Sequence, residues 1–240
     1  MQLVTRKSEV KIYLDLCIKA YHLNGLNACV NEFKNQVLNK RVKFPLLEFC
    51  GKTVFQELLE EDHIAFCDKI EELKTEGGNV LLGIILQCRL INHFEESLQK
   101  ASEYIANADF WYVCDIIGER VFGYSILNFS KKTIPEIKKI SKHPSFWVIR
   151  SLGAGIHYSI KKGLDKKNVS ILFKLLLSMA ASNNKEIRQG VGWAAKTTAK
   201  FHPDIIEQFQ LEIQNKEQVA NWFRTKIEIG LNRHAYAKRN

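Results

Sequence analysis

Apolar residues recur every three or four positions along almost the whole chain, and this spacing constrains the fold more than any other feature of the sequence. Such a spacing places apolar side chains on one face of a helix. Only 4 of the 240 residues are proline, and no segment alternates apolar and polar residues for long. The sequence therefore predicts an all-α protein.

The predicted helices follow one another as antiparallel pairs that are joined by short turns. We expect them at residues 8–23, 26–38, 53–60, 62–73, 79–90, 95–106, 110–121, 131–141, 145–162, 166–181, 184–200, 205–214 and 218–231. Gly25 is expected to end the first helix, and Asn79 and Asp109 are expected to cap the N-termini of two others. The apolar run within residues 79–90 predicts a helix that is buried between two layers.

The spacing of three tryptophans indicates repeats. Trp111 and Trp147 are 36 residues apart, and Trp147 and Trp193 are 46 residues apart. These intervals bracket the period of HEAT and armadillo helix pairs, which bury their apolar faces by stacking. We therefore expect one domain over residues 1–240, a HEAT-like helical-repeat solenoid of antiparallel helix pairs that is curved and has a concave basic groove. Residues 233–240 are expected to form a frayed tail.

Positive charge is concentrated after residue 100. Residues 1–100 carry 13 lysines and arginines against 14 aspartates and glutamates, whereas residues 101–240 carry 22 against 12. The repeats within residues 101–232 are therefore basic and the N-terminal repeats are near-neutral. Such asymmetry favours a polyanion as partner, because phosphate binding depends on charge neutralisation and counterion release. The alternative is a soluble basic protein that has no such partner.

Several other classes of protein are excluded by what the sequence lacks. No apolar run approaches the roughly 18 residues that a membrane span needs, and the N-terminus has no signal-peptide pattern. The six cysteines occur singly without zinc-ligand spacing, so we expect reduced, buried thiols and no metal site. Glycine-rich nucleotide loops and hydrolase motifs are absent. We expect a cytoplasmic monomer that has no membrane contact.

The helix after residue 109 carries the most informative polar residue. Trp111 and Asp115 are four residues apart and share a helix face, among apolar neighbours. A carboxylate in such a setting is costly unless it has a partner. Two later helices supply candidates, through Trp147 with Arg150 and through Trp193, and we expect these five residues to line one groove. The alternatives are tryptophans that only fill the core and an Asp115–Arg150 bridge that is purely structural.

The ordered patterns resemble a known family. They are Trp111-x-x-x-Asp115, Trp147-x-x-Arg150, and Glu186-Ile-Arg-Gln-Gly-Val-Gly-Trp193-Ala-Ala-Lys followed by Lys200-Phe-His-Pro-Asp204. Over roughly residues 105–210 they resemble the HEAT-like repeat alkylpurine DNA glycosylases, the AlkD-like DNA alkylation repair proteins. These enzymes remove cationic N3- and N7-alkylated purines from duplex DNA and need no metal or organic cofactor.

The resemblance implies a role for each residue of the expected groove. Asp115 would be catalytic, because a carboxylate stabilises the oxocarbenium-like sugar that forms when a cationic base leaves. Trp111 and Trp193 would flank the sugar with their π faces, and Trp147 would support the helix that bears Arg150. Arg150 would bind a backbone phosphate. DNA would be the partner of the basic C-terminal part.

The N-terminal residues depart from the family's pattern. The segment Lys40-Arg41-Val42-Lys43-Phe44-Pro45 does not form a recognisable version of the family's N-terminal DNA-binding motif, and residues 1–100 carry no net positive charge. We therefore predict that excision of N3- and N7-alkylpurines is weak or absent. The two alternatives are an active glycosylase and a non-enzymatic HEAT scaffold that binds protein or unusual nucleic-acid structures.

Overall fold

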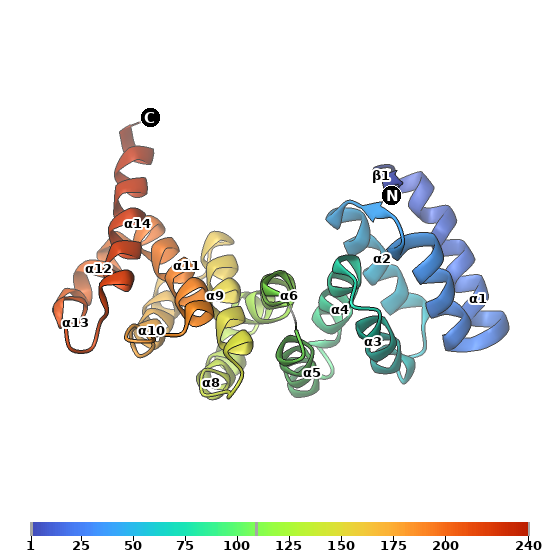
Figure 1. Ribbon diagram of the computed structural model, residues 1–240, viewed down its shortest axis with the longest axis horizontal. Coiled ribbons are helices and arrows are strands. Elements are labelled where there is room, and N and C mark those ends of the chain that lie inside the picture. The colour runs from blue at the N-terminus through green and yellow to red at the C-terminus, as the bar shows by residue number, and fades with distance from the viewer. Residues whose placement is uncertain (1, 109, 240) are drawn as a thin grey trace. The chain divides into compact units, whose positions relative to one another are not determined.

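The computed structural model describes residues 2–108 and 110–239, with the side chains of residues 238 and 239 left out. The expected N-cap Asp109 lies outside the described residues. Helices dominate this part of the chain, so the prediction of an all-α protein is confirmed (Figure 1). None of the described helices is both long and apolar enough to cross a membrane. The chain divides into two compact units, Met1–Ala101 and Ser102–Asn240, which are described separately below.

Unit 1 consists of helices and one minimal pair of strands. Its elements are β1 (Leu3–Val4), α1 (Lys7–Phe33), the π-helix η1 (Lys34–Leu38), β2 (Arg41–Val42), α2 (Phe44–Glu57), α3 (Asp62–Glu72) and α4 (Glu76–Arg89). The following helix, α5 (Phe94–Ala106), contains the boundary between the units. Within α1, Gly25 has a φ of 77° and a ψ of −172°, a conformation that only glycine adopts readily, so the helix is interrupted at the expected position.

Two expected boundaries in unit 1 were wrong. Helix α2 begins at Phe44 instead of residue 53, with Pro45 in its first turn, where the missing N–H of proline leaves no hydrogen bond unmade. Helix α4 begins at Glu76 instead of residue 79, because the Thr75 side chain accepts a hydrogen bond from the Gly78 backbone N–H and caps the helix. Gly77 and Gly78 therefore lie in the first turn of α4.

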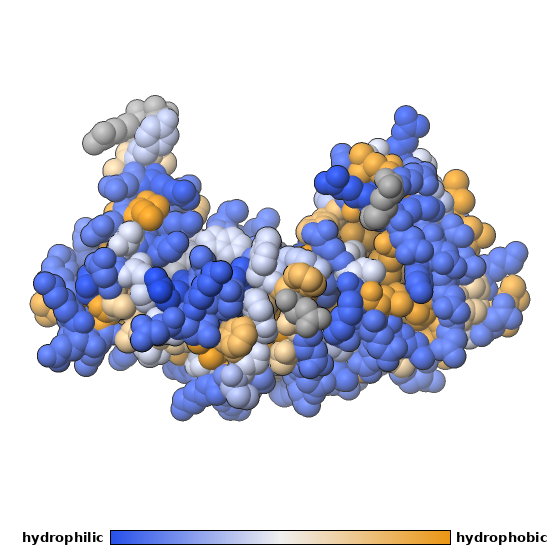
Figure 2. Space-filling view, viewed as in Figure 1, coloured by the Kyte–Doolittle hydropathy of each residue, from blue (hydrophilic) through white to orange (hydrophobic). Residues whose placement is uncertain are grey.

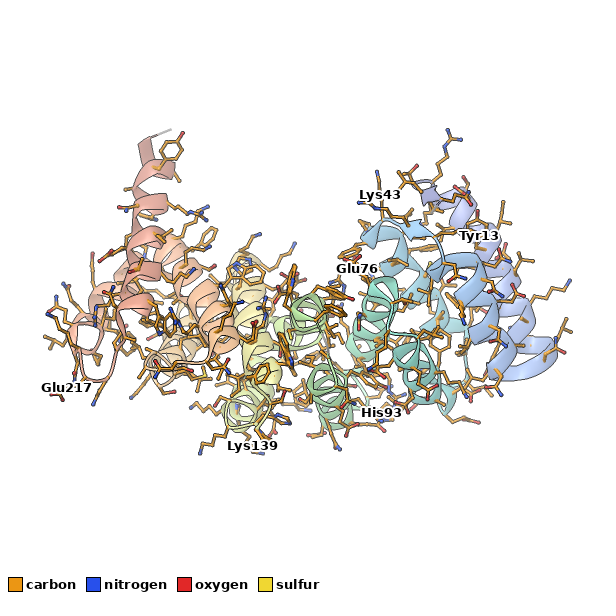
Figure 3. The ribbon with its side chains drawn as sticks, in the orientation of Figure 1. Tyr13, Lys43, Glu76, His93, Lys139 and Glu217 are labelled. Carbon is orange, nitrogen blue, oxygen red and sulfur yellow. The ribbon has the colours of Figure 1, made fainter. Side chains whose placement is uncertain are left out.

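Helix α4 forms the centre of unit 1. Every residue from Val80 to Leu86 is buried, which confirms the burial expected from its continuous apolar sequence. Gly51 of α2 lets α4 approach closely, since a Cβ atom there would lie 2.9 Å from Ile84. On the surface of unit 1, Tyr13 of α1 donates a hydrogen bond of 2.7 Å to Glu9 (Figure 3).

The described residues of unit 2 form helices that are joined by turns, without a strand among them. The helices are α6 (Trp111–Ile117), the π-helix η2 (Gly118–Gly123), α7 (Tyr124–Asn128), α8 (Ser130–Ile140), α9 (Phe146–Lys161), α10 (Lys166–Leu177), α11 (Lys185–Phe201), α12 (Pro203–Gln208), α13 (Gln210–Gln214) and α14 (Asn221–Arg239). The single helix expected at residues 205–214 is divided at Phe209. Helix α14 continues through residues 233–239, where the sequence led us to expect a frayed tail.

Alternate helices of unit 2 pack side by side and run in the same direction. Helix α6 with η2 contacts α9, α9 contacts α11, and α11 contacts α14 (Figure 1). Gly118 lies against Ser151, and the later residue Gly123 lies against the later residue Tyr158. Residue numbers therefore increase in the same direction along both helices, so the helices are parallel. We call this row the inner helices. Helices α8, α10 and α12 contact the inner helices from one side, and α8 also contacts α10. Lys139 lies on α8 and is exposed (Figure 3).

Local sequence explains how these helices start. Asn184 accepts hydrogen bonds from the backbone N–H groups of Glu186 and Ile187, and Asp165 accepts one from Asn168. Both are short polar side chains of the kind that cap free N–H groups. Hydrophilic side chains cover most of the face of unit 2 that Figure 2 shows, as expected for helices whose apolar faces are turned toward one another.

Candidate functional site

Glycines bring α6 with η2, α9 and α11 into close contact. A Cβ atom on Gly153 would lie 2.0 Å from the Gly190 carbonyl oxygen, and one on Gly190 would lie 2.2 Å from the Arg150 carbonyl oxygen. A Cβ atom on Gly118 would lie 2.7 Å from the Ser151 carbonyl oxygen. Any larger residue at these positions would force the helices apart. The backbone separation at the site is thus set by glycine.

An acidic or basic residue precedes each of these glycines by about one helical turn. Asp115 precedes Gly118, Arg150 precedes Gly153, and Glu186 precedes Gly190. Residues three or four apart lie on the same helix face. The close approach of the three helices therefore brings one side chain from each helix together.

Arg150 lies between two carboxylates. Its Nη2 atom lies 3.2 Å from Asp115 Oδ2, and its Nε atom lies 3.4 Å from Asp115 Oδ1. Its Nη1 atom donates to Glu186 Oε2 over 2.5 Å. Two carboxylates and one guanidinium leave the group with a formal charge of −1. We call these three residues the Asp–Arg–Glu cluster.

The cluster is mostly enclosed but reaches solvent. The exposed fraction of the side chain is 19% for Asp115, 19% for Glu186 and 11% for Arg150. Trp111 lies beside it with 56% exposure, and its ring centre is 5.6 Å from the Arg150 guanidinium carbon. An exposed indole next to a partly accessible carboxylate offers a π face and a negative charge to one ligand.

Burial affects the ionisation of Asp115. Loss of water around the carboxyl raises its pKa above the ordinary value, the hydrogen bonds from Arg150 oppose that rise, and the negative charge of Glu186 adds to it. Because Arg150 is shared with Glu186, its positive charge compensates Asp115 only in part.

Trp193 lies two turns beyond Glu186 on the same face of α11. Its ring stacks on His157 of α9, with the ring centres 4.1 Å apart and the planes at 29°. His157 Nδ1 lies 2.6 Å from Thr197 Oγ1. Burial and the nearby charges of Lys161 and Lys196 lower the pKa of His157 to about 4, so the ring is neutral at pH 7. Trp193 is therefore held by packing within the inner helices.

Trp147 is half-buried in the first turn of α9, and its ring centre lies 5.0 Å from that of Phe146. The structure thus pairs Asp115 with Arg150 and places the Arg150 guanidinium over the Trp111 ring. Trp147 and Trp193 lie on the same helices as members of the cluster, Trp147 three residues before Arg150 and Trp193 seven residues after Glu186. A groove shared by all five residues stays a prediction.

Sequence reasoning missed two residues of this region. Glu186 was noted only as part of a pattern, and His157 was not singled out. The spacing of Glu186 and Trp193 by seven residues puts them on one helix face, and the same spacing relates Arg150 and His157. That signal was present in the sequence, but it does not show which helix faces which.

Positive charge gathers farther along the inner helices. Burial and the neighbouring charges of Arg233 and Lys226 lower the pKa of Lys196. Among the described residues, Lys196, Lys226 and Arg233 form no ion pair with a carboxylate. Like charges that approach without a counterion favour an anionic ligand. No group of three or more metal-ligating side chains occurs in the part of the chain that the structure describes.

Comparison with known proteins gives one match. A family model described as DNA alkylation repair enzyme matches residues 33–225, which include the whole Asp–Arg–Glu cluster and extend into unit 1. No curated protein and no solved structure gives a significant match.

Proposed function

The chain belongs to the DNA alkylation repair enzyme family, and from this membership we propose that unit 2 binds alkylated DNA and presents Asp115 to the lesion. The observation that carries the proposal is the contact of Asp115 and Arg150 beneath the exposed Trp111 ring. The proposed substrates are cationic N3- and N7-alkylpurines, and release of these bases is proposed to be weak or absent.

The chemistry of the cluster suits a cationic lesion. Breaking the bond between the sugar and a cationic base leaves positive charge on the sugar, which a nearby carboxylate stabilises. The formal charge of the cluster is −1, so it attracts such a species more strongly than a neutral base. Trp111 would cover the sugar or base with its π face, and Trp193 would lie farther along the same surface.

Two features argue for slow release. Asp115 already has a guanidinium partner, which occupies both of its oxygens. A carboxylate that is held in this way has less negative charge to offer the departing base. Unit 1 has no surplus of positive charge to hold the duplex, since the excess of lysine and arginine lies after residue 100.

The remaining contacts with DNA are proposed to come from the basic residues of α11 and α14. Lys196, Lys226 and Arg233 form a group without carboxylate partners among the described residues. Such a group binds phosphates with release of counterions. It lies on the same row of helices as the cluster, so one DNA backbone running along the inner helices would contact both.

The architecture supports a HEAT-like repeat for unit 2. Alternate helices form a parallel row with a second set of helices on one side, as repeated helix pairs do when they stack. We propose that the whole chain is one such array of antiparallel helix pairs, with a concave basic face. A cytoplasmic location and a monomeric state stay predictions.

The decisive experiment is single-turnover release of N7- and N3-methylpurines from duplex DNA at micromolar protein. We expect release that is at most slightly above the spontaneous rate and that disappears in Asp115→Asn. Asp204→Asn is the matched control, because Asp204 is an exposed aspartate that pairs with Lys166 outside the cluster. Fast release that depends on Asp115 would show instead an active glycosylase.

A non-enzymatic scaffold gives a different result. It would bind branched or single-stranded nucleic acid, or a protein, with no base release by the wild type. Release that is above the spontaneous rate and equal in the wild type and Asp115→Asn would refute a catalytic role of Asp115.

A further inference from the structure

Glu186 takes part in the cluster although nothing assigns it a role. It lies in the first turn of α11, where Asn184 caps the helix and holds the Glu186 backbone N–H. A carboxylate in a first turn is stabilised by the positive end of the helix. Arg150 is its ion-pair partner among the described residues. The side chain is therefore fixed where it meets Arg150.

The hydrogen bonds of Arg150 are divided between its two partners. The Asp115 carboxylate accepts hydrogen bonds from Arg150 Nε and Nη2, with distances of 3.2–3.4 Å. The Glu186 carboxylate accepts one from Nη1, with a distance of 2.5 Å. Only 11% of the Arg150 side chain is exposed. The contact with Glu186 holds Nη1 toward α11. An anion from solvent therefore meets a guanidinium that is already paired with a carboxylate on two sides.

A phosphate that approaches Arg150 also meets a net negative charge. The two carboxylates outnumber the guanidinium, so one carboxylate has to give up its share of Arg150 before a phosphate gains it. Glu186 accepts a single N–H group whereas Asp115 accepts from two nitrogen atoms. Glu186 is thus the partner whose displacement breaks fewer contacts.

We propose that Glu186 is a positioning residue that holds the Arg150 guanidinium on the protein, and that a DNA phosphate binds Arg150 only by displacing the Glu186 carboxylate. This inference rests on the proposed function, because it takes nucleic acid as the ligand of the site. It adds a competition between an internal carboxylate and a backbone phosphate for one arginine.

The test is a double-mutant cycle on DNA affinity. Binding of an undamaged, fluorescently labelled 20-base-pair duplex is measured over a range of salt concentrations for the wild type, Glu186→Gln, Arg150→Gln and the double variant. Thermal unfolding of each variant checks that the fold is kept. Glu212→Gln is the charge-matched control, since Glu212 is exposed on α13.

We expect Glu186→Gln to tighten binding about tenfold at low salt, the value of one hydrogen bond to a charged group. The slope of log affinity against log salt should stay close to that of the wild type, because the same phosphate contacts Arg150 in both proteins once Glu186 is displaced. The tightening should disappear in the Arg150→Gln background and be absent in Glu212→Gln.

Two results would overturn the inference. Equal tightening in the presence and absence of Arg150 would show that Glu186 merely repels phosphate. Unchanged affinity of Glu186→Gln, with a wild type that binds the duplex, would show no competition and would leave the proposed function standing. If no variant binds the duplex, the proposed function and this inference fail together.

Discussion

Asp115 is subject to opposing influences that come from different helices. Burial and Glu186 raise its pKa, and the hydrogen bonds from Arg150 lower it. The bridge between Asp115 and Arg150 was one of the structural alternatives that the sequence left open, and the structure contains it. The carboxylate still reaches solvent beside Trp111, so the bridge does not by itself exclude a role in chemistry.

The low pKa of His157 predicts a pH-dependent stability. Its pKa of about 4 lies below the ordinary value of 6.5, so the unfolded chain binds the proton more tightly. The resulting stability is present above pH 6.5 and is lost as the pH falls toward 4. We expect His157→Gln to flatten this part of the dependence of the unfolding free energy on pH, as measured by urea denaturation. His22→Gln, at an exposed position, should leave the dependence as it is in the wild type.

The cysteine thiols of the native protein should react slowly. Burial raises the pKa of Cys29, Cys50 and Cys114 to about 12, so few thiolates exist at pH 8. We expect slow modification by a colorimetric disulfide reagent in buffer and rapid modification of all six thiols in denaturant. Fast modification of Cys114 in the native state, identified by mass spectrometry, would show that α6 opens readily.

At the scale of the elements, the packing of α9 against α11 depends on a pair of glycines. Gly153 and Gly190 face each other with no room for a Cβ atom on either side. Arg150 and Glu186 lie one turn away on the same helices. The geometry of the cluster is therefore a consequence of how closely the two backbones approach.

Substitution of Gly190 should disturb both stability and the cluster. The Cβ atom of Gly190→Ala would lie 2.2 Å from the Arg150 carbonyl oxygen, so the helices must move apart. We expect a loss of about 1–3 kcal/mol in the free energy of unfolding, as for other overpacked sites. Gly77→Ala is the control, because the nearest atoms there are the ends of leucine side chains at 3.3 and 3.4 Å. An equal loss in both variants would contradict this account.

At the scale of the whole molecule, the distribution of charge follows the division into units. The near-neutral residues 1–100 coincide almost completely with unit 1, and the excess of positive charge belongs to unit 2. The family model nonetheless extends from residue 33 to residue 225. The family match thus covers parts of both units, whereas the excess of positive charge lies in unit 2 alone.

This asymmetry predicts that removing charge from unit 2 matters more than removing it from unit 1. We expect Lys196→Gln combined with Arg233→Gln to weaken duplex binding and to reduce the salt slope by about 1.8, the value for two phosphate contacts. Lys11→Gln combined with Lys34→Gln removes the same charge from exposed positions of unit 1 and should change the affinity little. Equal effects of the two double variants in a fluorescence binding assay would refute a DNA surface confined to unit 2.

The sequence by itself determined most of what depends on residues close in the chain. It predicted the helical class, the break at Gly25, the burial of α4 and, to within one residue, the start of α11, because periodicity and glycine act within a few residues. It also indicated the family, since the Trp, Asp and Arg patterns are local and ordered. The early starts of α2 and α4 were not predicted, because proline and threonine can begin a helix but also occur in turns.

Only the tertiary structure decided which helix faces meet. Glu186 lies 36 residues from Arg150, and no local pattern states that their helices run in parallel and touch at Gly153 and Gly190. Close packing between backbones sets that register, and it depends on the shapes of two surfaces at once. The ion pair between Asp115 and Arg150 was foreseeable as a possibility, but the sharing of Arg150 with Glu186 follows from the packing of three helices around one guanidinium.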